Sequence, residues 1–267
     1  MVAGTDRHTA GQEDGPKPAL VYDALLGGTT NFAADRRAAR LLRNAKPDLV
    51  PNILASRRFL VRGVDYLTRG AGVRQFLDIG TGIPASDPTH EVAQRANPAA
   101  RVLYADNDPV VLVHAKALLD STPEGACTFI NADLRDPAGI LEQARLTLDL
   151  SEPVAVMLLG ILYYLTDAED PYGIVRQLMA ATAPGSYLMI SHPASDLHAG
   201  AAAKAAGRYG QLTGIPQTNR SHRGVTRFFE GLDLLDPGVV EANRWQPGPD
   251  DDPRPQLSNW VGIARKP

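Results

Sequence analysis

The fold of this chain is decided by the stretch Gln75-Phe76-Leu77-Asp78-Ile79-Gly80-Thr81-Gly82-Ile83-Pro84. An apolar run ends in an acid, two glycines follow with one residue between them, and a helix-compatible segment comes next. This order predicts a buried parallel strand, a sharp turn at Gly80 and Gly82, and then a helix whose N-terminal N–H groups face a ligand. Glycine suits such a turn because a ligand can approach the backbone closely only where no Cβ intervenes.

Two cofactor classes use such a turn. Gly80, Gly82 and Ala85 fit G-x-G-x-x-A, the dinucleotide fingerprint. The same two glycines together with Asp78 fit the D-x-G-x-G pattern of proteins that bind S-adenosylmethionine (SAM). Asp78 favours SAM, because a carboxylate attracts its ammonium and sulfonium groups but would repel the pyrophosphate of a dinucleotide. A tight strand–helix turn with no ligand is the structural alternative.

Two further strands are predicted to end in acids. The stretch 101–109 is a short apolar run that ends at Asp106, and Pro109 opens the next helix. The stretch 127–134 ends at Asp133. A carboxylate after the second strand can accept both ribose hydroxyls of an adenosine, and Asp133 could take the adenine amino group. Three strands that end in acids at one sheet edge are a more specific signal than any one of them.

At these residues the chain resembles a known family. FLDIGTG (76–82), YADNDP (104–109) and NADLRDP (131–137) resemble class I SAM-dependent methyltransferases. The segments YDALLGGTTNFAADR (22–36), HEVAQ (90–94), PGSYLMISH (184–192) and FFEGLDLLDPG (228–238) are similar to one bacterial subfamily of S-adenosyl methyltransferases. The resemblance covers roughly residues 18–267. The chain departs from the family pattern at Pro84, where a third glycine is expected, and at Tyr163, where relatives often carry histidine.

The resemblance and the alternating strands and helices imply an α/β fold. We expect a doubly wound, Rossmann-like, seven-stranded and mostly parallel sheet with an antiparallel last strand, plus an N-terminal helical extension. The expected strands are 74–79, 101–105, 127–131, 154–159, 186–191, 239–245 and 258–264, the last two paired antiparallel. Residues 1–17 are read as a flexible tail, 18–70 as an N-terminal helical lid, and 71–267 as the SAM-binding methyltransferase core.

The expected cofactor-binding residues come from the strand ends and from the extension. They are Asp78, Gly80, Thr81, Gly82, Asp106, Asn107, Asp133, Leu134 and Gly160 in the core, and Tyr22, Asn31 and Arg57 before it. His90, Tyr163 and His192 are the candidates for a catalytic base, because each is expected near a strand end. A structural role is the alternative for each of these three.

Arg57 stands out because it falls among the apolar residues of the helix predicted over 53–69, whereas Arg58 and Arg62 fall on its polar face. A charge on a buried face is costly unless it is paired. Arg57 could therefore pair with a structural carboxylate or extend to solvent. It could also face the carboxylate of the methionine part of SAM, which a guanidinium matches with two hydrogen bonds.

The extension before the core has features of a lid. Gly27-Gly28 should stop a first helix that begins at Pro18, and Thr29-Thr30-Asn31 should cap a second helix over Phe32–Asn44. We expect these helices to fold over the methionine end of SAM and to exclude water. Packing on the sheet for stability alone is the alternative.

Composition limits the other classes. The 267 residues are 44% hydrophobic with a net charge of −3 and a sequence pI of about 6.1, so nucleic acid is not favoured as a partner. The single cysteine, Cys127, fits a reducing cytoplasm, and no apolar run reaches membrane-spanning length. No metal-ligand spacing is present, and His90-Glu91 near Asp87 is read as part of a surface helix.

The predicted function is therefore methyl transfer from SAM to a small-molecule acceptor. An NAD-dependent oxidoreductase is the first alternative, although Asp106 follows the fingerprint at a longer spacing than the usual ~20 residues. A SAM-binding protein without turnover is the second. The acceptor, the atom methylated and the oligomeric state cannot be read from the sequence.

Overall fold

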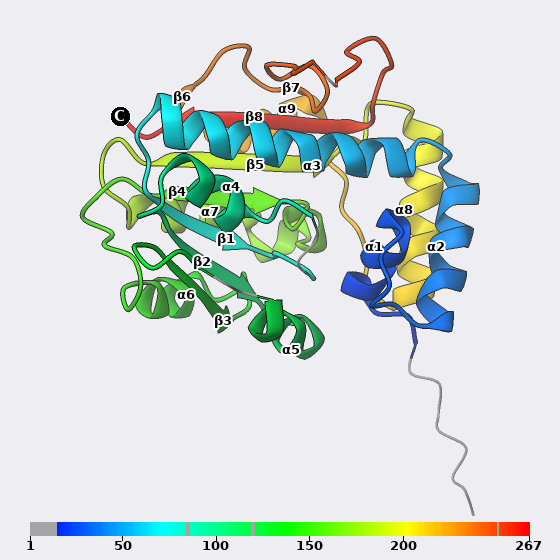
Figure 1. The fold of residues 1–267 in the computed structure, drawn as a ribbon. Helices are drawn as coiled ribbons and strands as arrows, with labels where there is room; N and C mark the ends of the chain where they lie inside the picture. Colours follow the sequence, from blue (N-terminus) through cyan, green and yellow to red (C-terminus); the bar gives the residue numbers. More distant parts are fainter. Residues whose placement is uncertain (1–14, 84–85, 119–120, 250) are drawn as a thin grey trace, which may run out of the picture.

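The computed structural model describes residues 15–83, 86–118, 121–249 and 251–267. Within these ranges the core is one eight-stranded sheet in the order β3-β2-β1-β4-β5-β8-β6, with β7 also paired to β8 (Figure 1). Neighbours among β1 to β5 run parallel, and β8 runs antiparallel to β5. The strands are β1 (Gln75–Ile79), β2 (Arg101–Asp106), β3 (Ala126–Asn131), β4 (Ala155–Leu159), β5 (Tyr187–Pro193), β6 (Asp233–Leu234), β7 (Val240–Glu241) and β8 (Asn259–Arg265).

The two short strands β6 and β7 share one edge of β8. β6 pairs with Ala264 and Arg265, and β7 pairs with Trp260 and Val261, while β5 occupies the other edge. The sheet therefore has seven strand positions, which confirms the mostly parallel sheet with an antiparallel last strand. The strand expected over 239–245 is wrong beyond residue 241, because a turn closed by the Arg244 N–H and the Glu241 carbonyl (2.8 Å) ends it there.

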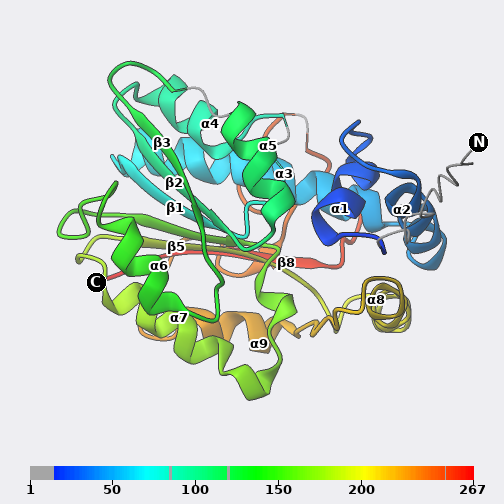
Figure 2. The same ribbon diagram turned by 90° about the horizontal axis from the view of Figure 1, so that it is seen from below.

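Helices cover both faces of the sheet (Figure 2). One layer holds α3 (Leu49–Asp65) and α4 (Thr89–Ala96), and the other holds α6 (Pro137–Ala144), α7 (Pro171–Ala180) and α9 (His222–Thr226). Side chains alternate along a strand, so Leu77 and Ile79 pack in the second layer and Phe76 in the first. The same alternation directs Asp78 toward α3 and α4. Helix α5 (Pro109–Leu118) lies beside β3.

A third group of helices lies beyond the carboxyl ends of the parallel strands (Figures 1 and 2). It consists of α1 (Pro18–Leu26), α2 (Ala33–Ala45) and α8 (Ala199–Thr213), which share a small apolar core that includes Val21, Leu42 and Tyr209. We call residues 18–48 and 195–218 the helical cap. The predicted boundary at residue 70, between the helical lid and the core, stays a prediction. Helix α3, which comes before that boundary, packs on the sheet, and α8, which comes after it, packs in the cap.

The turn between α1 and α2 differs from its predicted form. Gly27 ends α1 in the left-handed conformation (φ 81°), as the Gly-Gly stop predicts. Capping of α2 by Thr29-Thr30-Asn31 was wrong: the N-cap residue is Phe32, whose N–H donates to Asp35 Oδ2 at 2.9 Å. The Asn31 amide instead donates to Asp23 Oδ2 and to the Gly28 carbonyl, both at 2.7 Å, because the Asp23 carboxylate organises this turn.

The polar face of α3 is covered by the C-terminal loop. Arg58 Nε and Arg62 Nη1 both bind the carboxylate of Asp251, and Arg62 also donates to the carbonyls of Ala242 (2.7 Å) and Trp245 (3.1 Å). This face therefore anchors residues 242–249 and Asp251 on the first helical layer. Within the described ranges, each helix is too short or too polar to cross a lipid bilayer.

Candidate functional site

The parallel strands bring the three predicted acids to one edge of the sheet. In the register of β1, β2 and β3, Ile79 lies opposite Ala105, and Asp106 lies opposite Asn131. The carboxyl ends of these three neighbouring strands therefore hold Asp78, Asp106 and, two residues beyond β3, Asp133. Ligands of open α/β sheets bind outside this edge.

The two glycines of the turn after β1 have different surroundings. Gly80 and Gly82 are both left-handed, with φ of 76° and 63°. A Cβ on Gly80 would lie 2.5 Å from Ile161 Cγ1, whereas a Cβ on Gly82 would meet nothing within 4 Å. Gly80 therefore permits close packing of the loop after β4, and only Gly82 opens onto free space. The Thr81 hydroxyl turns back to the Gly82 carbonyl (3.1 Å).

A helix follows the turn, as the sequence predicts. Helix α4 starts at Thr89, and the N–H of His90 donates to the Tyr104 hydroxyl at 2.9 Å. The turn is therefore not joined directly to a helix, and this first-turn N–H does not face a ligand. Pro84 and Ala85, which the cofactor patterns also use, lie outside the described residues.

Asp78 and Arg57 meet on the first helical layer. Asp78 is buried and accepts a hydrogen bond from Thr89 Oγ1 at 2.7 Å. Burial raises the pKa of Asp78 to about 6, although the Thr89 hydrogen bond and the positive charge of Arg57 oppose the rise. Arg57 Nη2 donates to the carbonyls of Ser86 (2.7 Å) and Asp87 (3.1 Å). Arg57 therefore fixes the loop between β1 and α4 and places its charge beside Asp78.

Asp106 holds the glycine turn from the neighbouring strand. Its Oδ2 accepts the Gly82 N–H at 2.9 Å, and its Oδ1 accepts the Asp108 N–H at 3.0 Å. Burial raises the pKa of Asp106, and the two backbone hydrogen bonds partly offset that rise. The side chain is thus half-buried and not exposed at the strand end, and each oxygen keeps a lone pair for a ligand.

Asp133 is fixed by its own neighbours. It accepts hydrogen bonds from the Arg135 N–H and from Asn107 Nδ2, both at 2.8 Å, and pairs with the Arg135 guanidinium at 3.3 Å. Burial would raise the pKa of Asp133, but these hydrogen bonds and the Arg135 charge outweigh it and hold the pKa below its usual value. Asn107 therefore orients Asp133. The Leu134 side chain is buried in the core, which leaves only its main chain toward the edge.

Two residues predicted from the extension, Tyr22 and Asn31, lie in α1 and in the turn after it. Tyr22 is half-buried on α1, and the charge of Arg57 reaches it. Helix α1 also places Leu20 against Ile83 of the glycine turn and Val111 of α5. Asn31 is buried in the α1–α2 turn, where its side chain is fully engaged by the turn and by Arg36.

The two candidate histidines are held in structural contacts. His90 is buried, and its Nδ1 lies 3.0 Å from the Tyr104 hydroxyl, so it belongs to the core and not to a surface helix. His192 is buried at the end of β5, with Nδ1 2.9 Å from the Pro193 carbonyl and Nε2 3.1 Å from Arg220 Nη1. Burial lowers the pKa of His192 to about 3, and the Arg220 charge adds to this effect. The described residues contain no group of three His, Cys, Asp or Glu side chains that could hold a metal.

Tyr163 lies next to Gly160, where β4 ends. Gly160 is left-handed (φ 67°), and a Cβ there would be 3.9 Å from the ring of Tyr163. The Tyr163 hydroxyl donates to the Tyr164 hydroxyl at 3.0 Å, and that hydroxyl lies 2.7 Å from the Tyr209 hydroxyl. Burial raises the pKa of Tyr163 to about 12, which disfavours the ionised form that a base would need.

The sequence interpretation missed three residues that contact the segments around the candidate site. Tyr209 reaches the edge from α8, Arg135 links Asp133 to Glu169 (2.6 Å) and to the Tyr164 carbonyl (3.2 Å), and Arg220 anchors the loop after β4. Arg135 directly follows the Asp133-Leu134 pair, so its position was a usable signal. Tyr209 had none, because it lies in an alanine-rich helix whose packing partner is α2.

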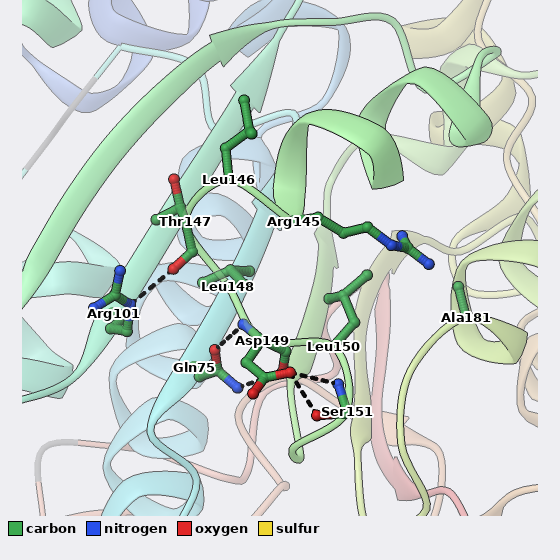
Figure 3. A pocket seen from close by; sticks show the side chains of 10 residues that line it. All are labelled: Gln75, Arg101, Arg145, Leu146, Thr147, Leu148, Asp149, Leu150, Ser151 and Ala181. Carbon is green, nitrogen blue, oxygen red and sulfur yellow. Dashed lines mark hydrogen bonds between the residues drawn. The ribbon is translucent and has the colours of Figure 1, made fainter.

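A separate pocket of about 770 Å³ lies at the opposite end of the sheet (Figure 3). Gln75 and Arg101 stand at the amino ends of β1 and β2, and the loop 145–151 closes the pocket. The Gln75 amide binds the N–H and the carbonyl of Asp149 at 2.7 and 2.8 Å, and Arg101 Nε binds the Thr147 carbonyl at 2.7 Å. These groups anchor the loop to the strands, far from the acids.

Comparisons with known proteins show the family and the overall fold. The sequence pattern of the S-adenosyl methyltransferase family matches residues 6–267. A DUF574 family protein from Streptomyces avermitilis is 38% identical, with a TM-score of 0.92 over 95% of this chain and 98% of that one. A protein from Thermobifida fusca, described as a methyltransferase, is 40% identical, with a TM-score of 0.86 over 94% and 95% of the two chains.

More distant structures share the fold alone. An O-methyltransferase family protein from Burkholderia thailandensis is 15% identical, with a TM-score of 0.51 over 87% of this chain and 59% of that one. No curated protein matches the sequence. The family match spans nearly the whole chain, and the two relatives share its length and fold. The chain belongs to the S-adenosyl methyltransferase family, and its cofactor is S-adenosylmethionine.

Proposed function

We propose that this protein transfers the methyl group of SAM to a small molecule. The observation that carries the proposal is the placement of Asp78, Asp106 and Asp133 at the carboxyl ends of three neighbouring strands, where the helical cap overhangs the sheet. Asp106 also accepts the N–H of Gly82, whose Cβ position is open. The family match supports SAM over the NAD alternative. A small molecule is favoured over nucleic acid as the acceptor because the net charge of the chain is −3.

The residues present fit the cofactor. Asp106 has two carboxylate oxygens with free lone pairs for the ribose hydroxyls, and the open space at Gly82 leaves room for a ligand against the backbone. Asp133 stands one strand further along for the adenine amino group. Asp78 and Arg57 offer opposite charges to the ammonium and carboxylate of the methionine part.

Methyl transfer from SAM needs few catalytic groups from the protein. SAM supplies a methyl group that is already activated as a sulfonium. The chain has to bind and orient the donor and the acceptor and to exclude water. The strand-end acids bind and orient, and Leu20 of α1, packed on Ile83, covers the glycine turn. His192 and Tyr163, the two candidate bases at the ends of β5 and β4, are held neutral by burial.

The decisive experiment compares ligands by calorimetry. Purified protein is titrated with SAM, with S-adenosylhomocysteine (SAH) and with NAD. We expect saturable binding of SAM and SAH and none of NAD, because SAM and SAH both bring an ammonium group to the Asp78 carboxylate, whereas NAD brings an anionic pyrophosphate. Saturable heat with NAD and none with SAM would refute the proposal. Binding of SAM without transfer to any acceptor of a metabolite pool, followed with labelled SAM, would support the binding protein without turnover.

Arg57→Met should weaken SAM binding about tenfold, the size of a charge-assisted hydrogen bond, while the melting temperature changes little. Methionine keeps much of the stem volume and removes the charge. Arg95→Met is the matched control, because Arg95 holds the same loop through Asp87 at 2.6 Å but is mostly exposed. A large drop in melting temperature with unchanged affinity would assign Arg57 a structural role.

SAM affinity should depend on pH through Asp78. Its pKa is about 6 in the folded protein without cofactor, against 3.8 ordinarily, so the carboxyl is protonated below pH 6. A cation prefers the ionised form, so affinity should rise as pH increases through 6, by up to about tenfold per unit below it. Stability without cofactor should move the opposite way and fall between pH 3.8 and about 6, because the folded state binds the proton more tightly.

Calorimetry and melting curves between about pH 4 and 8 measure both trends. Asp78→Asn should flatten both, because the amide does not titrate in this range. An affinity that is constant across pH 6 in the unmodified protein would show that Asp78 is not the group that meets the cation.

A further inference from the structure

The loop after β4 is in direct contact with the glycine turn after β1. Ile161 of this loop lies so close to Gly80 that a Cβ on the glycine would come within 2.5 Å of the Ile161 side chain. The Gly80 N–H also donates to the Ala105 carbonyl of β2 at 2.8 Å. The glycine turn is therefore held by β2 and by the loop after β4, and a shift of that loop would leave the turn without one of its two supports.

Arg220 holds this loop from a distant part of the sequence. Its Nη1 donates to the Leu162 carbonyl at 3.0 Å, and its Nη2 donates to the Leu165 carbonyl at 2.9 Å and to Asp167 at 2.8 Å. Arg220 is 5% exposed, so water hardly competes for these hydrogen bonds. A guanidinium suits this position, because its donors lie in one plane and reach several acceptors at once.

The backbone of the same segment joins the loop to β5 and to the helical cap. The Arg220 N–H donates to the Pro193 carbonyl (3.3 Å), and the Arg220 carbonyl accepts the Ser195 N–H (3.0 Å). Two residues earlier, the Thr218 N–H donates to the Tyr163 carbonyl of the loop at 2.8 Å. The chain that returns from α8 therefore meets the end of β5 and the loop after β4 at this one place.

Arg220 also fixes the tautomer of His192 at the end of β5. Nδ1 of His192 lies 2.9 Å from the Pro193 carbonyl, which can only accept, so Nδ1 carries the proton. Nε2 lies 3.1 Å from Arg220 Nη1, which can only donate, so Nε2 offers its lone pair. His192 is therefore a neutral imidazole whose basic nitrogen is already in use, and it adds a further contact between Arg220 and β5.

One donor of Arg220 is not used in this way. Within the described residues its buried Nε–H has no acceptor, and the guanidinium lies 5.8 and 5.6 Å from the ring centroids of Tyr172 and Phe228. A buried donor without a partner is destabilising, and apolar side chains often replace a buried ion with little loss of stability. Stability is therefore a weak reason for an arginine among these rings, whereas the loop carbonyls are a direct one.

We propose that Arg220 is a positioning residue for the cofactor, which holds the loop after β4 where Ile161 supports the glycine turn. The effect passes from the guanidinium to the loop carbonyls, from the loop to Ile161, and from Ile161 to Gly80. Arg220 thus acts through the loop and not by contact with the ligand. This inference rests on the proposed function, because the turn matters for SAM only if SAM binds beside Gly82.

The test compares Arg220→Met with Arg62→Met in the full-length protein. Arg62 is the matched control, because it also binds two carbonyls and one aspartate, but those of the C-terminal loop. Hydrogen exchange measured by mass spectrometry, without ligand, follows the amides of residues 79–83 and 160–167. In Arg220→Met both segments should exchange faster, by about 3- to 30-fold at the glycine turn, the usual range of coupling through packed groups. In Arg62→Met both should exchange as in the unmodified protein.

Calorimetry with SAH is the second measurement. Arg220→Met should bind SAH about 3- to 30-fold more weakly, whereas Arg62→Met should lose stability and keep its affinity. The Asp167 side chain is 76% exposed, so Arg220→Met leaves no buried carboxylate without a partner and should fold. Arg220→Lys keeps the charge, but its ammonium cannot span both loop carbonyls as the guanidinium does, so it should change exchange and affinity in the same direction by less.

Ile161→Ala tests the last step of the path. It keeps the guanidinium contacts and removes the support of Gly80, so residues 79–83 should exchange faster and SAH should bind more weakly, as in Arg220→Met. Unchanged exchange of residues 79–83 in the Arg220 variants that fold, or in Ile161→Ala, would overturn the proposal. Failure of the unmodified protein to bind SAH would instead refute the proposed function, and the exchange data, taken without ligand, would still decide the role of Arg220.

Discussion

Asp106→Ala is expected to weaken SAM binding by about 1.5–3 kcal/mol, which is the loss of charge-assisted hydrogen bonds to the ribose. This corresponds to roughly a 10- to 150-fold rise in Kd. The structure adds a second contribution, because Asp106 Oδ2 also accepts the Gly82 N–H at 2.9 Å. Alanine therefore removes the ribose partner and loosens the glycine turn together. Calorimetry with SAH measures the affinity, and circular dichroism checks that the fold is retained.

Two variants separate these contributions. Asp106→Asn keeps one carbonyl oxygen for a backbone N–H and loses the charge, so it should fall between the original protein and the alanine variant. Asp136→Ala is the matched control: Asp136 likewise accepts a backbone N–H, that of Gly139 at 3.0 Å, but at the start of α6. An affinity of Asp106→Ala equal to that of the unmodified protein would mean that the ribose is held elsewhere.

Removal of residues 1–46 is expected to weaken SAM binding tenfold or more, about 1.4 kcal/mol. The deletion removes α1 and α2, and with them the contact of Leu20 with Ile83 and Val111 over the glycine turn. Water would then reach the methionine end of the site. Because Tyr209 of α8 packs against the deleted helices, the deletion also exposes apolar surface of α8. Circular dichroism should still show the folded sheet, since β1 begins only at Gln75.

Full-length variants test the same contact without exposing the apolar surface of α8. Leu20→Ser should weaken SAM binding in the same direction, because it disturbs the contact above the turn and leaves α2 against α8. Leu146→Ser is the matched control, since Leu146 is 86% exposed at the opposite end of the sheet. Removal of residues 1–14 should change nothing. A shortened chain that folds and binds SAM as tightly as the complete one would leave packing as the role of the extension.

The sequence by itself determined the sheet and the end of the sheet at which the three acids gather. Each of β1 to β4 carries its own signal, an apolar run followed by an acid or a glycine, and parallel strands necessarily bring these ends together. Asp78, Asp106 and Asp133 could therefore be placed together without coordinates, and the structure has them on neighbouring strands. Their roles as cofactor ligands, with those of Arg57 and Tyr22, stay predictions for the variants above.

Only the tertiary structure decided how the second half of the site is built. The cap joins α1 and α2 to α8, and Tyr209 meets Tyr164 across 45 residues of sequence. Such contacts depend on which apolar faces find each other when distant segments pack, and no local pattern specifies that choice. The same holds for Gly80, whose missing Cβ makes room for Ile161 from another loop. Local chemistry thus placed the acids at the strand ends, while long-range packing built the helical cap beside them.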